Sequence, residues 1–420
     1  MLDIKFIRQN QEKVKEGVAK KQAKVDIDRL LEVDQKRREA LQALEQMLAQ
    51  KNRANKEIQE AKDEKEKNII ILKMRELDDN SDRLNKDLKE LDEEFNNLML
   101  KVPNLPLEDV PAGKNDTENI VLREEGEKTK FSFQPKDYME IGEFLDLIDI
   151  QRAAKVSGTR FGYIKGGAAI LEFSLVNLAL ETLAKENFVP VIPPVMLKPE
   201  MMEGMGYVER GAEEIYYLER DKLYLVGTSE QSIGAMHSGE IFEEKELPKR
   251  YAGFSTCFRR EAGAYGKDTK GILRVHQFDK VEMFSFCHPE KSKEEHQLLL
   301  KMEEKLMQLL EIPYRVINIC AGDLGDPAAA KYDIEAWLPG QNQYRETHST
   351  SNCTDYQARR LNIRYRDSKT KKPEFVHTLN GTAFAIGRML IAIIENYQQK
   401  DGSVLVPKAL QKYTGFKIIK

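Results

Sequence analysis

From Asp28 to Val102 the sequence contains neither proline nor glycine, and it is rich in Leu, Glu, Lys and Gln. Such a run lacks the residues that break helices and consists largely of good helix formers. A polar run, AKDEKEKN at 61–68, divides it into two halves. The stretch therefore predicts an antiparallel helical hairpin, with arms of roughly 30 residues that extend about 45 Å at the rise of an α-helix.

The second half of this stretch has the clearer apolar pattern. Mostly apolar side chains recur there in steps of four and three, at Ile70, Met74, Leu77, Ser81, Leu84, Leu88, Leu91, Phe95 and Leu98. This spacing is typical of a coiled-coil seam. A weaker seam in the first half is expected at Leu30, Leu41, Leu44, Leu48 and Ile58, with polar breaks at Asp34, Arg37, Lys51 and Asn55.

From this segment alone, a dimerisation or spacer element is the favoured use of such a hairpin, and the charge of the helical stretch does not settle the question. Acids concentrate in 76–94, with nine against three bases, whereas 29–62 has eight bases against six acids. Residues 1–25 hold seven bases and three acids, a balance of 7 − 3 = +4. If the arm binds RNA, we expect the contact on the first helix and its tip.

The composition of the whole chain is that of a cytoplasmic protein. Its 420 residues are 41% hydrophobic, no apolar run approaches the length of a membrane span, and the start, MLDIKFIRQN, lacks the apolar core of a signal peptide. A net charge of −4 gives no overall attraction to DNA or RNA. The cysteines form no CxxC pair, so we expect reduced thiols and no zinc at Cys257, Cys287, Cys320 and Cys353.

A proline-rich segment, KVPNLPLEDVPAGKNDTEN at 101–119, ends the helical stretch and predicts a linker. The expected domains are therefore 1–101, with the coiled-coil arm, and 120–420, joined by a linker at 102–119. Helices are expected in the second domain at 137–155, 168–187 and 382–397. Strands are expected at 189–192, 214–218, 222–226, 251–259, 272–286, 314–319, 332–337 and 375–379. Because most of these strands are separated by hairpin-length spacings, we predict an α+β domain with a mostly antiparallel sheet.

The stretch from Thr256 to Phe286 has an unusual strand pattern. Two extended runs flank a turn rich in Gly and Lys, which predicts a hairpin. Side chains two apart share a face, so one face is expected to carry Arg259, Glu261, Arg274, His276, Phe278, Lys280 and Glu282. A face with charges of both signs and an aromatic ring suits a polar ligand, although an exposed salt-bridged hairpin is the alternative.

Several segments together resemble the bacterial serine-tRNA ligase family of class II aminoacyl-tRNA synthetases. They are FRREAGAYGKDTKGILRVHQFDKVE at 258–282, GTSEQ at 227–231, ETHSTSNCTDYQARRLNIRYR at 346–366 and LNGTAFAIGRMLIAIIENYQ at 379–398. The linker VPNLP and the helical hairpin before it also resemble this family. The resemblance implies an antiparallel class II catalytic sheet, a homodimer with Pro194 in its interface motif, and a coiled coil that binds tRNA(Ser).

The reaction that the resemblance implies is attack of the L-serine carboxylate on the α-phosphate of ATP, followed by transfer of serine to tRNA(Ser), and to tRNA(Sec) where present. The nucleophile is already ionised, so no general base is needed. Arg259, Arg388 and Glu346 are the implied catalytic residues, since a planar guanidinium can bridge carboxylate and phosphate. The implied ATP-binding residues are Arg259, Arg260, Glu261, Val275, Phe278, Glu346, Thr347, His348, Ser349 and Arg388.

The resemblance also implies sites for serine and for a metal ion. Serine would contact Thr228, Ser229, Glu230, Arg259, Glu282 and Thr382. Glu346 and Ser349 offer the hard oxygen ligands that suit Mg²⁺ beside a triphosphate. His348 departs from the family pattern, which more often has a small residue there, and surface or packing use is the default for a single histidine.

Two alternatives remain open at this stage. A synthetase-like enzyme could load an activated small amino acid onto a carrier protein, but the long helical arm argues against that. A non-catalytic RNA-binding descendant is the other, and the intact set of Arg259, Glu261, Glu346 and Arg388 argues against it.

Overall fold

The computed structural model describes residues 1–61, 63–262 and 270–420, and it omits the side chains of residues 209 and 210. By its internal contacts the chain divides into two units. The first comprises residues 2–19 and 23–103, and the second comprises Met1, residues 20–22 and residues 104–420.

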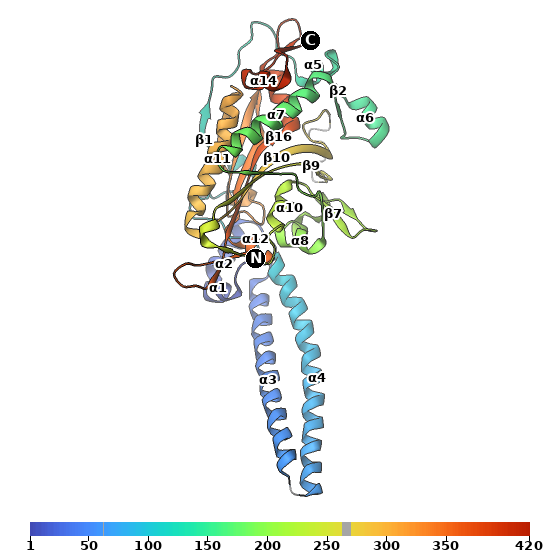
Figure 1. Ribbon diagram of the computed structural model, residues 1–420, viewed down its shortest axis with the longest axis vertical. Helices are drawn as coiled ribbons and strands as arrows, with labels where there is room; N and C mark the ends of the chain where they lie inside the picture. Colours follow the sequence, from blue (N-terminus) through green and yellow to red (C-terminus); the bar gives the residue numbers. More distant parts are fainter. Residues whose placement is uncertain (62, 263–269) are drawn as a thin grey trace. The chain divides into compact units, whose positions relative to one another are not determined.

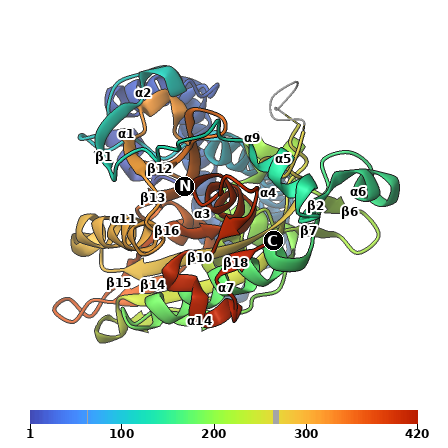
Figure 2. The same ribbon diagram turned by 90° about the horizontal axis from the view of Figure 1, so that it is seen from above.

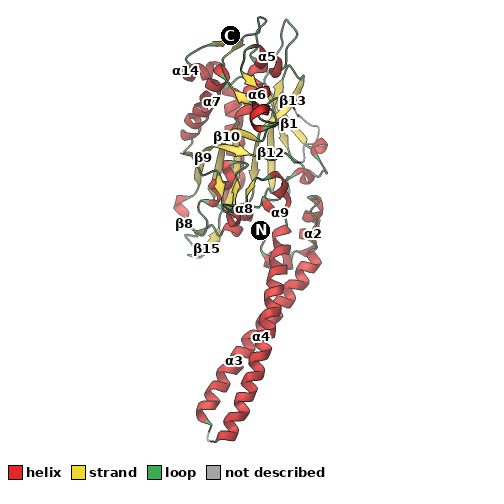
Figure 3. Ribbon diagram, turned by 90° about the vertical axis from the view of Figure 1, so that its right-hand side faces the viewer, coloured by secondary structure: helices red, strands yellow, loops and turns green. Residues whose placement is uncertain are grey.

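The first unit consists of helices. Two short helices, α1 (Ile4–Gln9) and α2 (Gln11–Lys20), precede the long helices α3 (Ile27–Glu60) and α4 (Glu64–Lys101). The long pair lies side by side and antiparallel (Figures 1 and 3). Each begins with an aspartate cap, because Asp26 accepts from the Arg29 amide at 2.9 Å and Asp63 from the Glu66 amide at 2.7 Å. The predicted helical hairpin is confirmed.

The seam of the second long helix follows the sequence pattern, since every position from Ile70 to Leu98 in the predicted series is half-buried. The seam of the first is different, because Leu41 and Leu48 are 37% and 61% exposed. Its sheltered positions also keep steps of three and four, but they include alanines and cations: Leu30, Val33, Arg37, Ala40, Leu44, Met47, Lys51, Ala54 and Ile58.

Two of these cations pair with acids of the second helix, which explains why polar residues belong to the seam. Arg37 pairs with Asp92 and lies over the Phe95 ring, and Lys51 Nζ lies 2.6 Å from Asp78. The charges that look like interruptions in the sequence are therefore contacts between the two helices, and the prediction of a seam through Leu41 and Leu48 was wrong.

The second unit is built on an eight-stranded sheet with the order β1-β11-β12-β13-β16-β10-β9-β4. All neighbouring pairs are antiparallel except β4 with β9, as the sequence spacing predicted. The strands are β1 (Ile120–Glu125), β4 (Val189–Val191), β9 (Lys249–Phe258), β10 (Gln277–Cys287), β11 (Tyr314–Asn318), β12 (Ala330–Leu338), β13 (Gln343–Asn352) and β16 (His377–Ala385).

One face of this sheet is covered by helices α7 (Gly166–Ala184), α11 (Ser292–Leu309) and α13 (Ile386–Asn396). Figures 1 and 2 show α7 and α11 there from two directions. Val281 and Met283 of β10 point into this core, together with Leu175 of α7 and Leu299 of α11. The strand alternation then leaves the opposite face of β10 for the polar residues of the site.

Helix α7 corrects one expectation from the sequence. It is long and apolar enough by length and composition to cross a membrane, although no apolar run of that length was expected. Half of its apolar window is buried inside the protein, where Leu171, Leu175 and Leu178 join the core.

Several predicted boundaries also differ from the structure. The helix expected at 137–155 is two short helices, α5 (Tyr138–Phe144) and α6 (Ile150–Ser157), separated by β2 (Ile148–Asp149), which pairs with β3 (Tyr163–Ile164). The helix expected from Thr382 begins only at Ile386, because residues up to Ala385 form β16. In the hairpin predicted at 256–286, the second strand begins only at Gln277. The Gly and Lys-rich turn includes residues 263–269, which lie outside the described residues.

A second apolar cluster joins Phe284 and Phe286 of β10 to residues of the helices α8 (Pro199–Met205), α10 (Ser229–Ala235) and α12 (Tyr356–Leu361). All four cysteines are buried free thiols, as predicted. The remaining short elements are β5 (Met196–Leu197), α9 (Val208–Gly211), β6 (Tyr217–Leu218), β7 (Leu223–Leu225), β8 (Ile241–Glu243), β14 (Arg364–Arg366), β15 (Pro373–Phe375), β17 (Val404–Leu405), α14 (Gln411–Thr414) and β18 (Ile418–Ile419).

Candidate active site

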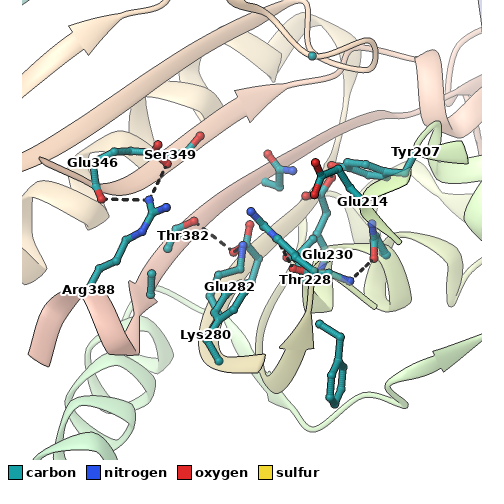
Figure 4. Close-up of a pocket in the computed structure, with 18 of the residues that line it drawn as sticks. Tyr207, Glu214, Thr228, Glu230, Lys280, Glu282, Glu346, Ser349, Thr382 and Arg388 are labelled. Carbon is teal, nitrogen blue, oxygen red and sulfur yellow. Dashed lines mark hydrogen bonds and ion pairs between the residues drawn. The ribbon is translucent and has the colours of Figure 1, made fainter. Parts of the chain in front are cut away.

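A cavity of about 680 Å³ lies on the face of the sheet opposite the helical core. Figure 4 shows Arg388, Glu346 and Ser349 at one side of it, Glu230 and Tyr207 at the other, and residues of β10 and β16 between them. Its walls contain both cations and carboxylates, so it suits a ligand with both charges.

Strand β10 forms the floor of the cavity. Phe278, Lys280 and Glu282 face it, while Val281 and Met283 point into the core. The predicted alternation therefore holds within the strand. Arg274 and Val275 also line the cavity from the loop before β10, whereas the His276 ring bonds to the Arg259 carbonyl at 3.0 Å and lies beside Phe161.

Two β-bulges bring further side chains to the same face. In regular alternation Glu346 and Ser349, three residues apart in β13, would point to opposite faces. The register of β12 with β13 shifts at this point, so that Ile334 pairs with His348 but Glu335 pairs with Glu346. Thr347 is the extra residue, and Glu346 and Ser349 both line the cavity. A similar shift in β16 lets Thr382 and Ala385 share this face.

Arg259 follows the end of β9 and projects into the cavity. Its Nε donates to the Gly227 carbonyl at 3.1 Å, and its guanidinium lies 5.3 Å from the centre of the Phe278 ring. These contacts hold the side chain over the floor, and among the described residues the Nε bond leaves the two terminal nitrogens available to a ligand. Glu261, whose backbone is left-handed at φ 52°, accepts from Arg274 Nη1 at 2.8 Å.

Arg388 enters the cavity from the first turn of α13, an otherwise buried apolar helix. Its Nη1 donates to the Glu346 carbonyl at 3.0 Å and lies 3.2 Å from Glu346 Oε1. Enclosure in the cavity raises the pKa of Glu346, but the cations Arg388, Lys331 and Arg259 outweigh this and lower that pKa to about 2. Glu346 is therefore an anion throughout the neutral range.

The region around Glu346 and Ser349 has oxygen ligands of the kind that Mg²⁺ prefers. Asp333 faces Ser349 across the two strands, and its Oδ1 is buried without a hydrogen-bond partner in the part of the chain that the structure describes. No group of three or more His, Cys, Asp or Glu side chains that could hold a metal is found among those residues. A metal here would thus need ligand oxygens from a substrate.

The other end of the cavity holds the residues expected to contact an amino acid. Thr228 caps α10 and accepts from the Glu230 amide at 3.3 Å. Glu230 accepts from the Tyr207 hydroxyl at 2.8 Å and from Gln357 Nε2 at 3.3 Å, which fixes its carboxylate. Thr382 lines the same cavity, and its hydroxyl donates to Glu282 Oε2 at 3.4 Å.

Most of the expected site residues line the cavity, namely Thr228, Glu230, Arg259, Glu261, Val275, Phe278, Glu282, Glu346, Thr347, Ser349, Thr382 and Arg388. Three others have their side chains elsewhere. The Ser229 hydroxyl donates to the Gly253 carbonyl at 3.2 Å, Arg260 lies over the Tyr216 ring, and His348 is buried on the helical side of the sheet beside Phe384. Burial lowers the pKa of His348 to about 3, which fits the packing use.

The structure adds residues that sequence reasoning did not assign to the site. Lys280, Tyr207, Lys331 and Asn380 all line the cavity. Lys280 was placed on the correct face but given no role. Lys331 lies in β12, which begins at Ala330, but outside the predicted strand at 332–337; a strand predicted two residues longer would have placed it on the face of Asp333.

Comparison with known proteins identifies both parts of the chain. Residues 216–397 match the family described as tRNA synthetase class II core domain (G, H, P, S and T). Residues 1–106 match the family described as Seryl-tRNA synthetase N-terminal domain.

Relatives of known function match over nearly their whole length. The serine–tRNA ligase of Thermobifida fusca is 46% identical over 99% of this chain and 98% of its own, and that of Dictyoglomus turgidum is 45% identical over 100% and 99%. The solved seryl-tRNA synthetase from Pyrococcus horikoshii complexed with ATP superposes with a TM-score of 0.93 at 42% identity, covering 100% of this chain and 99% of that one. The cytoplasmic serine–tRNA ligase from Naegleria fowleri in complex with AMP gives 0.89 at 35% identity, with coverage of 100% and 99%.

Proposed function

The chain belongs to the serine–tRNA ligase family of class II aminoacyl-tRNA synthetases, and from this premise we propose which residues carry out each step of serine activation and transfer. The carrier-loading and non-catalytic alternatives give way, because the relatives are serine–tRNA ligases over their whole length. The observation that carries the assignment of residues is the cavity itself, which has Arg388 and Glu346 at one end, Thr228 and Glu230 at the other, and the Glu282–Thr382 pair between them.

ATP binds across the end of the cavity nearest Arg259. The adenine stacks on Phe278, opposite the Arg259 guanidinium, and its amino group donates to Glu261, while the backbone near Val275 borders the nucleotide. The Pyrococcus relative, solved as a complex with ATP, superposes on the whole chain and supports this placement. Arg388 contacts the γ-phosphate from α13.

Glu346 and Ser349 would hold a Mg²⁺ ion together with phosphate oxygens, and Asp333, whose Oδ1 is buried without a partner among the described residues, lies beside them. When bound, such an ion neutralises charge on the triphosphate. Arg388 contributes to the same neutralisation from the other side of Glu346.

Serine binds with its ammonium group on Glu230 and Thr228 and with its hydroxyl on Glu282 and Thr382. Its carboxylate then reaches Arg259, which contacts the α-phosphate at the same time. A bond forms between a carboxylate oxygen and the α-phosphorus, and the bond from that phosphorus to the pyrophosphate oxygen breaks. Arg259 brings the two anions together and stabilises the charge that develops between them.

In the second step a ribose hydroxyl of the terminal adenosine of tRNA attacks the activated carbonyl, and AMP leaves. We assign tRNA(Ser) recognition to residues 1–101, with 102–119 as the linker and 120–420 as the catalytic domain. The match of residues 1–106 to the N-terminal family supports this. The first long helix and the arm tip are the proposed contacts, and tRNA(Sec) shares the same arm where a cell makes it.

The enzyme acts as a homodimer in the cytoplasm. Strand β4 is an edge of the sheet, and exposed apolar side chains lie on it, directly after it and on α7: Val189 is 54% exposed, Ile192 86% and Phe173 64%. A second copy covering these side chains would remove the unpaired edge and bury the exposed side of α7. Pro194 follows this strand. The cytoplasmic location of the Naegleria relative supports the compartment.

Serine-dependent exchange of pyrophosphate into ATP, followed by charging of tRNA(Ser), tests this function. We expect exchange with serine and none with alanine, and charging that needs the intact arm. Exchange without charging would favour the carrier-loading reaction, and absence of any exchange would overturn the proposed function.

A further inference from the structure

Lys280 is a buried cation in the middle of the cavity floor, and neither ATP nor serine contacts have been assigned to it. Its side chain is 8% exposed and that of Glu282 is 3% exposed, and the Lys280 ammonium pairs with Glu282 Oε2. Figure 4 shows the two side by side, between Thr382 and Glu230. A lysine is rarely buried to this degree without a specific partner.

The contacts of Glu282 leave one of its oxygens for a substrate. In the described part of the chain, both the Lys280 ammonium and the Thr382 hydroxyl contact Oε2. Oε1 then remains as an acceptor facing the cavity. Only an ionised carboxylate held in this orientation presents an acceptor that is never a donor.

The charge around Glu282 makes its ionisation dependent on Lys280. Burial raises the pKa of Glu282 to about 7, and the nearby Glu230 carboxylate acts in the same direction, whereas Lys280 and Arg259 lower it. The titratable and charged groups on the surrounding elements that interact electrostatically with it are Lys280, Glu230, Arg259, Tyr207, Cys257 and Glu303. Lys280 is the one cation among these that is paired with Glu282.

We propose that Lys280 is a positioning residue for serine recognition, which favours the ionised form of Glu282 and orients its carboxylate so that Oε1 accepts the serine hydroxyl. This inference rests on the proposed function. It makes discrimination against alanine a property of the pair rather than of Glu282 alone, because a substrate without a hydroxyl leaves this oxygen unsatisfied.

Removal of the cation changes the acceptor into an acid near neutral pH. In a Lys280→Met variant, Glu282 shares a buried pocket with Glu230 and takes up a proton at a higher pH than in the parent enzyme. With Lys280 present the pKa of Glu282 is about 7, so about half of its carboxylate is ionised at pH 7. A pKa about one unit higher would leave about a tenth ionised, so kcat/KM for serine should fall about fivefold at pH 7. It should recover as the pH approaches 9, since Glu282 then ionises, while the KM for ATP stays unchanged.

The test is a double-mutant cycle in ATP–pyrophosphate exchange, with serine and alanine as substrates between pH 6.5 and 9. The variants are Lys280→Met, Glu282→Gln, the double variant and the conservative Lys280→Arg. We expect Lys280→Met to have no further effect in the Glu282→Gln background, and Lys280→Arg to restore most of the serine kcat/KM. Lys293→Met, which removes an exposed lysine paired with Asp109, is the matched control and should behave as the parent.

Three results would overturn the inference. They are an undiminished effect of Lys280→Met in the Glu282→Gln background, a raised KM for ATP with that for serine unchanged, and a pH profile identical to the parent's. If Lys280→Met does not fold, the double variant, which buries no unpaired charge, and Lys280→Arg decide the question. If the parent enzyme shows no serine-dependent exchange, the proposed function fails first and the inference falls with it.

Discussion

The role of Arg388 gives a prediction whose size can be worked out from its surroundings. The perturbation is Arg388→Met, which keeps a flexible apolar stem on α13 but removes the cation that lies 3.2 Å from Glu346. Two unit charges about 4 Å apart interact by roughly 4 kcal/mol at an effective dielectric constant of about 20. Because the Arg388 side chain is 24% exposed, we reduce this to about 2–3 kcal/mol for its interaction with the terminal phosphate.

A loss of that size corresponds to a fall of about 30–150-fold in kcat/KM for ATP, since each 1.4 kcal/mol is tenfold. The assay is pyrophosphate exchange at saturating serine with ATP varied, alongside thermal unfolding of the same preparation. The melting temperature should change little, because Arg388 lies at the cavity and not among the buried residues of α13. Arg123→Met, an exposed arginine paired with Glu304, is the control and should leave exchange unchanged.

The reasoning is refuted if Arg388→Met lowers kcat/KM for ATP by less than about threefold, a change of well under 1 kcal/mol. A rise in the KM for serine with that for ATP unchanged would also refute it. In that case Arg388 would belong to the amino-acid end of the cavity or would serve only to hold Glu346.

Three further predictions concern stability, the arm and assembly. Glu303 is fully buried, with neither carboxylate oxygen bonded in the described part of the chain, and burial raises its pKa well above the ordinary value. The folded state then binds more protons than the unfolded state, so the free energy of unfolding should fall as the pH rises above about 4.5. Glu303→Gln should therefore raise the melting temperature at pH 8 and weaken its dependence on pH. A lower melting temperature of the variant at pH 8 would contradict this prediction. Replacing residues 47–82 by a short Gly-Ser turn between Gln46 and Arg83 keeps the register in which Arg37 pairs with Asp92. The shortened protein should retain pyrophosphate exchange and lose charging of tRNA(Ser). Preserved charging would mean that the arm is only a spacer. Phe173→Asp on α7 should shift the protein from dimer to monomer in sedimentation, whereas a monomeric parent would remove the proposed interface.

The long helical hairpin could be predicted from the sequence because its signals are local. The absence of proline and glycine and the apolar steps of the second helix each reflect the geometry of one helix, and the polar run at 61–68 marks the division, although α4 already begins at Glu64. The first helix was less predictable, since Arg37 and Lys51 gain their place in the seam only from Asp92 and Asp78 on the other helix. A seam inferred from leucines alone cannot include such pairs.

The site was predictable where its residues follow a regular strand and unpredictable where the strand is irregular. Phe278, Lys280 and Glu282 share a face by simple alternation. The bulge at Thr347 depends on pairing with β12, so no spacing rule within β13 brings Glu346 and Ser349 to one face.

Helix and strand preferences also competed at the end of β16. The apolar run that ends in α13 looks helical from Thr382, but residues up to Ala385 pair with β10. Tertiary pairing decided the boundary, and the same pairing turns Thr382 toward Glu282.

The account depends most on where the reacting groups lie, and a crystal structure with a non-hydrolysable seryl-adenylate analogue measures this directly. We predict the adenine on Phe278, the Arg259 guanidinium within hydrogen-bond distance of the phosphate-equivalent oxygens, and the serine hydroxyl on Glu282. An analogue bound with its adenine away from Phe278, or with Arg259 in contact with neither the phosphate nor the acyl group, would contradict the account.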